Sequence, residues 1–186
     1  LLMGVCRLIL DERLLSGTDG AVSLADFLDP QELSALYERF VLAYFRRHHP
    51  RLRAGAPWVS GGIEDAPVFL PGLHTDIVLT GPERTLIIDT KCYGRILGSR
   101  YDKSILSPAN RNQIYSYVMH EASDPRQSGR EVAGMLLYAQ TAVDPPIRET
   151  WTETGHRFHV RTLDLDRDFT EIAAQLDDVA ALLTSI

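Results

Sequence analysis

Two apolar runs joined by a tight turn constrain this chain more than any other stretch. Ile77-Val78-Leu79 and Leu86-Ile87-Ile88 lie on either side of a Gly81-Pro82 turn. Short apolar runs that are bounded by turn residues predict neighbouring strands. We therefore expect strands over about residues 73–80 and 84–90, and their apolar side chains must be buried by other elements of the fold.

Charged residues stand at the ends of both runs. Asp76 directly precedes the first run, and Asp89 directly follows the second. Asp is disfavoured inside strands, so each could simply end its strand, but two on neighbouring strands point to a shared role. Lys91 lies two residues past Asp89, and such residues of a strand share a face. Mg²⁺ prefers one or two carboxylates with several waters, so this set predicts a metal site that activates a water against a phosphate.

The rarity of lysine gives Lys91 further weight. The chain has 17 arginines and only two lysines, Lys91 and Lys103. Because an ammonium and a guanidinium are not interchangeable, a lysine in this position suggests that a compact cation is required. Chance remains the alternative explanation.

Three further segments carry helix signals. Helices are expected over residues 29–47, 108–122 and 168–183, since each begins with a capping residue and continues at helical spacing. Strands are expected around 132–138, which reads as buried on both faces, and 158–163, which alternates. The remaining expectations are a helix over 1–16, a short strand near Trp58-Val59 and a polar loop over 94–107. This order of elements predicts an α/β fold.

Residues on two of these helices are further site candidates. Glu38 lies at the margin of the apolar stripe of the first helix, either as a surface residue or as a third carboxylate near the metal. Gln113 and Tyr117 lie four residues apart, so they share a helix face. Tyr117 could pack in the core while Gln113 is solvated, or both could border the active site.

The chain has 186 residues, which is enough for one large core. Its net charge is −6, so nucleic-acid binding would have to be local or assisted by a partner. Two cysteines in no metal-binding pattern suggest a reducing, cytoplasmic setting, and no segment predicts a membrane span. Because the chain starts at Leu1, we expect residues 1–22 to be a helix and linker left from a longer protein, and residues 23–186 to be the functional domain.

Taken together, Asp76, Asp89-Thr90-Lys91, the helix with Glu38 and Gln113-x-x-x-Tyr117 resemble the PD-(D/E)XK nuclease superfamily, on its RecB-like side. The finer resemblance is to McrC, the nuclease subunit of McrBC modification-dependent restriction systems, and corresponds to its C-terminal, catalytic half. It spans about residues 1–165, with matching runs at Leu36–Phe40, Leu70-Pro71, Thr75–Ile77, Leu86–Lys91, Asn112–Tyr117 and Gly134–Tyr138. One departure is Thr75, where the superfamily pattern has Pro.

The resemblance implies a restriction-endonuclease-like core, with a mixed central β-sheet flanked by helices. It implies that Asp76, Asp89, the Thr90 carbonyl and, secondarily, Glu38 bind Mg²⁺, for which Mn²⁺ can substitute. Lys91 would position the attacking water, and Gln113 and Tyr117 would support the substrate or that water. The implied substrate is double-stranded DNA carrying 5-methylcytosine-type modification, and the implied partner is an McrB-like AAA+ GTPase.

Two other functions stay open on the sequence. One is another RecB-like repair or phage nuclease. The other is a non-catalytic interaction module with the nuclease fold, against which the intact Asp76, Asp89 and Lys91 set argues.

Overall fold

The computed structural model describes residues 29–59, 65, 67, 69, 72–92, 97–100, 103–140 and 145–184. The helix predicted over 1–16, and the domain boundary predicted at residues 22 and 23, lie outside this part.

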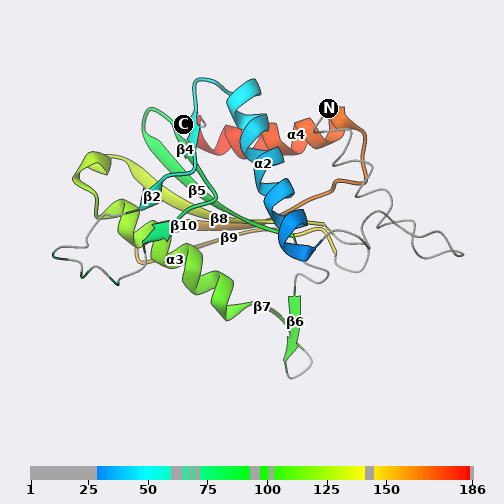
Figure 1. Cartoon of the computed structure of the whole chain (residues 1–186), viewed down its shortest axis with the longest axis horizontal. Coiled ribbons are helices and arrows are strands. Elements are labelled where there is room, and N and C mark those ends of the chain that lie inside the picture. Colours follow the sequence, from blue (N-terminus) through cyan, green and yellow to red (C-terminus); the bar gives the residue numbers. More distant parts are fainter. Residues whose placement is uncertain are drawn as a thin grey trace, which may run out of the picture.

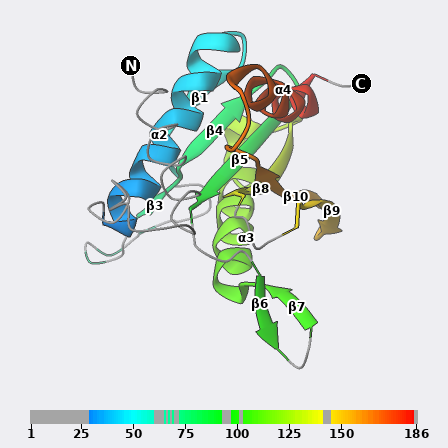
Figure 2. The same cartoon turned by 90° about the vertical axis from the view of Figure 1, so that its right-hand side faces the viewer.

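A six-stranded mixed sheet forms the centre of the fold, in the order β1-β4-β5-β8-β10-β9 (Figures 1 and 2). Its strands β5, β8 and β10 are parallel to one another, and the other neighbours pair antiparallel. The strands are β1 (Arg53–Gly55), β4 (Ile77–Thr80), β5 (Arg84–Lys91), β8 (Glu131–Ala139), β9 (Arg148–Glu153) and β10 (His156–Leu163). Two small antiparallel pairs are separate: β2 (Trp58–Val59) with β3 (Leu73–His74), and β6 (Leu97–Arg100) with β7 (Lys103–Leu106).

All three helices that were predicted in the described part are present, and each begins at a side-chain cap. The capping residues are Asp29 for α2 (Pro30–His48), Ser107 for α3 (Pro108–Ala122) and Asp168 for α4 (Phe169–Ala180). Asp29 forms the full capping box with Glu32, which satisfies amide groups that the first helical turn leaves without partners. Short 3₁₀ turns occupy Pro125–Gln127 (η2) and Ala181–Leu183 (η3).

The helices cover the sheet on both faces. In Figures 1 and 2, α2 and α4 lie on one face and α3 lies on the other. The alternating side chains of β5 show the same division, because Leu86 and Ile88 join the core under α2 and α4, whereas Ile87 joins the core under α3. The predicted α/β architecture, with a mixed central sheet flanked by helices, is therefore confirmed.

The structure corrects the predicted strand over 73–80. β3 ends at His74 and β4 begins at Ile77, so Thr75 and Asp76 lie between two strands that belong to different sheets. Thr75 is fully buried there, and both its amide and its hydroxyl donate to the carbonyl of Pro57. The interruption leaves Asp76 outside the hydrogen-bonded ladder.

The segment predicted as a polar loop over 94–107 also differs, since it contains the β6–β7 hairpin. This hairpin pairs only with itself, so it needs no apolar run of the kind that identifies a core strand. The edge strands β1 and β9 were not predicted either, and β9 is largely exposed. None of the described helices is both long and apolar enough to cross a membrane.

Candidate active site

At the break between β3 and β4, the side chain of Asp76 accepts a hydrogen bond from a backbone amide of β5. Its Oδ2 accepts hydrogen bonds from the Thr90 amide at 2.7 Å and from the Thr90 hydroxyl at 2.8 Å. The register of β4 with β5 pairs Ile77 with Ile88, so Asp76 lies at the level of Asp89. Both bonds go to one oxygen, and among the described residues no hydrogen bond reaches the other carboxylate oxygen of Asp76.

Asp89 and Lys91 form a buried ion pair at the carboxyl end of β5. They are two residues apart and therefore point to one face, with Lys91 Nζ 2.6 Å from Asp89 Oδ2. The Asp89 residue is 0% exposed, and among the described residues no donor reaches its Oδ1. Burial raises the pKa of Asp89 to about 6, Lys91 lowers it and Asp76 raises it further. A carboxylate of this kind gains most from a cation on its unpaired side.

The two candidates on α3 continue this polar chain. Lys91 Nζ donates to Gln113 Oε1 at 3.2 Å, and Gln113 Nε2 donates to the Tyr117 hydroxyl oxygen at 2.9 Å. Tyr117 is also buried in the core under α3, so packing and polar contact occur together. Burial raises the pKa of Tyr117, with further contributions from Asp89 and Asp76. The structure thus connects β5 and α3 through side chains that were chosen separately from the sequence.

Glu38 approaches from the other side, on α2. It is partly buried, and burial followed by repulsion from Asp76 raises its pKa. Glu38 also raises the pKa of Asp89. The three carboxylates therefore share one electrostatic environment, although Glu38 makes no direct contact with the other two among the described hydrogen bonds.

The donor set suits a hard cation that keeps much of its water. Within the described part of the chain, no group of three or more His, Cys, Asp or Glu side chains is gathered closely enough to enclose a metal ion. Mg²⁺ is usually held by one or two carboxylates plus water, and Asp76 and Asp89 offer this minimum. The unpaired, buried Oδ1 of Asp89 is the observation that fits a cation at this position.

An exposed aromatic residue at the rim of this site was missed as a site candidate. Trp58 of β2 pairs with His74 of β3, only two residues before Asp76, and its ring packs edge-on against the His74 ring. Trp58 is nevertheless 65% exposed, which is unusual for a tryptophan. The available signal in the sequence was a tryptophan within a stretch rich in Gly and Pro.

Comparisons with known proteins show what the sequence is similar to. No model of a known protein family matches the chain. The chain is 25% identical over 182 residues to the type IV methyl-directed restriction enzyme EcoKMcrBC of Escherichia coli (strain K12). The alignment covers 95% of the chain and 51% of that enzyme, so the chain spans about half the length of the relative it matches. The sequence is therefore similar, over nearly all of its length, to one half of a methyl-directed restriction enzyme.

Proposed function

We propose that this chain is a Mg²⁺-dependent endonuclease domain of the PD-(D/E)XK type, which cuts modified DNA as the nuclease part of a GTP-driven restriction complex. The single observation that carries this proposal is the joined set of Asp76, Asp89 and Lys91 at adjacent strand ends. The similarity to a methyl-directed restriction enzyme supports the same function and suggests methylated DNA as the substrate.

Asp76 and Asp89 would hold the metal ion, with the Thr90 carbonyl as a further ligand and Glu38 near its water shell. When bound, Mg²⁺ lowers the pKa of a water and neutralises charge on the scissile phosphate. Thr90 orients the carboxylate of Asp76 through two hydrogen bonds to one oxygen, and the other oxygen would hold the ion. Burial of Asp89 excludes water that would otherwise compete for its unpaired oxygen.

Lys91 would orient the attacking water and stabilise the extra negative charge of the transition state. Asp89 and Gln113 hold its ammonium from two sides, at 2.6 Å and 3.2 Å. Tyr117 in turn restricts the side chain of Gln113, because its hydroxyl oxygen accepts a hydrogen bond from the Gln113 amide. This support fixes the position of the ammonium before the substrate arrives, which is what efficient electrostatic stabilisation requires.

Trp58 would contact the DNA beside this centre. A broad exposed ring can lie against the sugars of the duplex, because it is apolar apart from its indole N–H. The edge-on contact with His74 holds the ring at the rim, so binding would cost little side-chain entropy.

The net charge of −6 suggests that the domain depends on a partner for DNA delivery. By the resemblance of its sequence to McrC, that partner would be an McrB-like AAA+ GTPase. We expect weak or no cleavage by the chain alone at physiological salt.

The test is cleavage of methylated duplex DNA, with Mg²⁺ and GTP, by the full-length subunit assembled with its GTPase. Asp89→Ala and Lys91→Ala should each reduce the rate by about 100-fold or more, because each removes charge stabilisation at the reacting phosphate. Lys91→Arg should not restore the rate, since a guanidinium differs in shape and hydrogen bonding from an ammonium.

Asp166→Ala is the matched control, because Asp166 is an exposed carboxylate in the turn before α4. Its rate should equal that of the unmodified complex. Full activity of the Asp89→Ala complex would show that the proposed centre does not cut DNA.

A further inference from the structure

Two arginines face each other across the edge of the central sheet. Arg148 of β9 and Arg161 of β10 are direct partners in the antiparallel register, so both side chains project to the face that carries α4. Like charges directly opposite each other on neighbouring strands are destabilising. Their pairing therefore needs a compensating negative charge.

The chain supplies only part of this compensation. Arg148 Nη1 forms an ion pair with Asp178 Oδ2 of α4 at 2.9 Å. Arg161 is only 9% exposed, and within the described part of the chain its side chain forms no hydrogen bond and no ion pair, so its guanidinium nitrogens depend on the solvent that reaches them. Burial and the neighbouring Arg148 lower the pKa of Arg161, while Asp178 acts in the opposite direction. The Asp178 carboxylate is thus the negative charge that acts on both guanidinium groups, those of Arg148 and Arg161.

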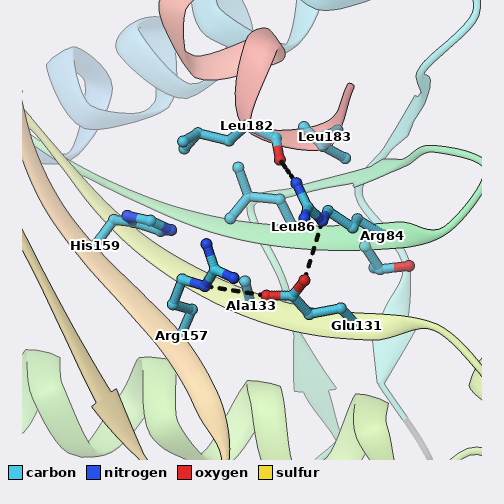
Figure 3. Close-up of a pocket in the computed structure, with 9 residues that line it drawn as sticks. Arg84, Leu86, Glu131, Ala133, Arg157, His159, Leu182 and Leu183 are labelled. Atoms are coloured by element: carbon cyan, nitrogen blue, oxygen red, sulfur yellow. Dashed lines mark hydrogen bonds and ion pairs between the residues drawn. The ribbon is translucent and has the colours of Figure 1, made fainter. Parts of the chain in front are cut away.

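The other arginine of β10, Arg157, has an acidic partner. Figure 3 shows Glu131 between Arg84 and Arg157, near the start of the parallel strands. Its Oε2 lies 3.0 Å from Arg84 Nε, and its Oε1 lies 3.2 Å from Arg157 Nε. Arg157 is also far more exposed than Arg161, so water can complete its solvation. The lack of an acceptor at the more buried Arg161 is therefore a local feature of its position.

Arg161 lines a groove of about 590 Å³ between α4 and the β9–β10 edge. Arg148, Asp178 and Gln175 line it as well. Arg167 also lines the groove, but its Nε is already engaged by Asp164 Oδ2 at 2.8 Å. The groove therefore has room for a ligand next to the one guanidinium there that lacks an acceptor among the described residues.

We propose that this groove binds a phosphate-type oxyanion between Arg161 and Arg148. A guanidinium presents a fork of N–H donors that matches two oxygens of a phosphate, and two such forks can share one dianion. Binding supplies the acceptor that buried Arg161 lacks and removes the repulsion between the paired arginines. The three arginines that line the groove are formally balanced by Asp164, Glu171 and Asp178, which favours a single phosphate group over an extended polyanion.

The position of the groove bears on the source of the phosphate. Arg161 pairs with Leu137 of β8, which pairs with Thr90 of β5, so Arg161 lies at the level of the candidate active site. It is two strands away, or about 10 Å across the sheet, and on the opposite face. A backbone phosphate of bound DNA and a free phosphate compound have the same recognition chemistry here, and the two arms of the experiment separate them.

The first arm measures the Tm of the 186-residue chain in inorganic phosphate against chloride at equal ionic strength. Millimolar phosphate should raise the Tm of the unmodified chain by about 3 °C. Arg161→Gln should abolish this rise and, without phosphate, should leave the Tm unchanged or higher, because it removes a buried charge that lacks an acceptor. A merely structural role for Arg161 predicts the opposite change without phosphate.

Arg167→Gln is the control from the same groove and should keep the full response to phosphate. Arg148→Gln is a second test variant that does not depend on a buried substitution, because Arg148 is mostly exposed. It should reduce the phosphate response in the same direction as Arg161→Gln.

The second arm measures the Kd for duplex DNA by fluorescence anisotropy at low salt, without divalent metal. If the phosphate is part of DNA, Arg161→Gln should weaken binding by about 10-fold and lower the salt slope by about one, as for a lost phosphate contact. An unchanged Kd together with a lost phosphate response identifies a free phosphate compound as the ligand. If Arg161→Gln matches Arg167→Gln in both arms, the proposal is wrong. Neither arm uses cleavage, so the result is independent of the proposed nuclease activity.

Discussion

Asp89 should make the chain less stable at neutral pH than at acidic pH, and Asp89→Asn should remove this dependence. Its carboxylate is fully buried, and burial raises its pKa from 3.8 to about 6 in the folded chain. Asn has nearly the same shape and does not titrate. The comparison of the two proteins therefore isolates the ionisation of one side chain.

The sign follows from proton binding. Below pH 3.8 the carboxyl group is protonated in both states and contributes no pH dependence. Between pH 3.8 and about 6 the folded state holds the proton more tightly, so the free energy of unfolding falls as pH rises. Above this window, ionised Asp89 lowers the free energy of unfolding by its full amount, which is about 3 kcal/mol for a shift of about two pKa units.

The measurement is urea unfolding at several pH values from 4 to 7.5, with EDTA to remove divalent metal. The free energy of unfolding of the Asp89→Asn chain, minus that of the unmodified chain, should rise by about 3 kcal/mol from the lowest to the highest pH. Asp166→Asn is the matched control for the substitution itself, because Asp166 is exposed. A flat difference for Asp89→Asn would refute the reasoning, because it would mean that ionised Asp89 is as well solvated in the fold as in the unfolded chain.

Other predictions concern packing and the site. Gly134→Ala should cost about 1–3 kcal/mol in urea unfolding, because a Cβ there would lie 2.8 Å from two side chains of α3, whereas Gly55→Ala should be tolerated. Gln113→Ala should lower the cleavage rate of the assembled complex about 10-fold with little change in KM, since it loosens the lysine ammonium without touching substrate; an equal rise in KM would contradict this. In a Trp151→Phe chain, DNA binding should quench the fluorescence of Trp58, and unchanged emission at saturating DNA would exclude the proposed contact.

The helices and core strands were predictable because their signals are local. Asp29, Ser107 and Asp168 cap the three helices, and each cap accepts a hydrogen bond from an amide two or three residues away. In the parallel centre, β5 and β8 were recognisable from their apolar runs, and β10 was recognisable from its alternation. The edge strand β9 was not, because an exposed edge buries little apolar surface and leaves no such run.

The break at Thr75 could not be predicted, because its causes are distant in the sequence. Thr75 is anchored to Pro57 and Asp76 to Thr90, so the strand is interrupted by partners that lie 18 and 14 residues away. Asp76 as a candidate ligand did follow from the sequence, since Asp is a poor strand residue. Its role as an acceptor for a strand amide did not.

The sequence by itself determined which side chains could do chemistry here, and it placed Asp89 and Lys91 on one face because strand periodicity is fixed by the backbone. Only the tertiary structure decided that Lys91 reaches Gln113 of α3, since the packing of α3 on the sheet sets that 3.2 Å contact. The facing of Arg148 and Arg161 was likewise a matter of register. Local patterns specify elements and their faces, whereas contacts between elements depend on how the whole core packs.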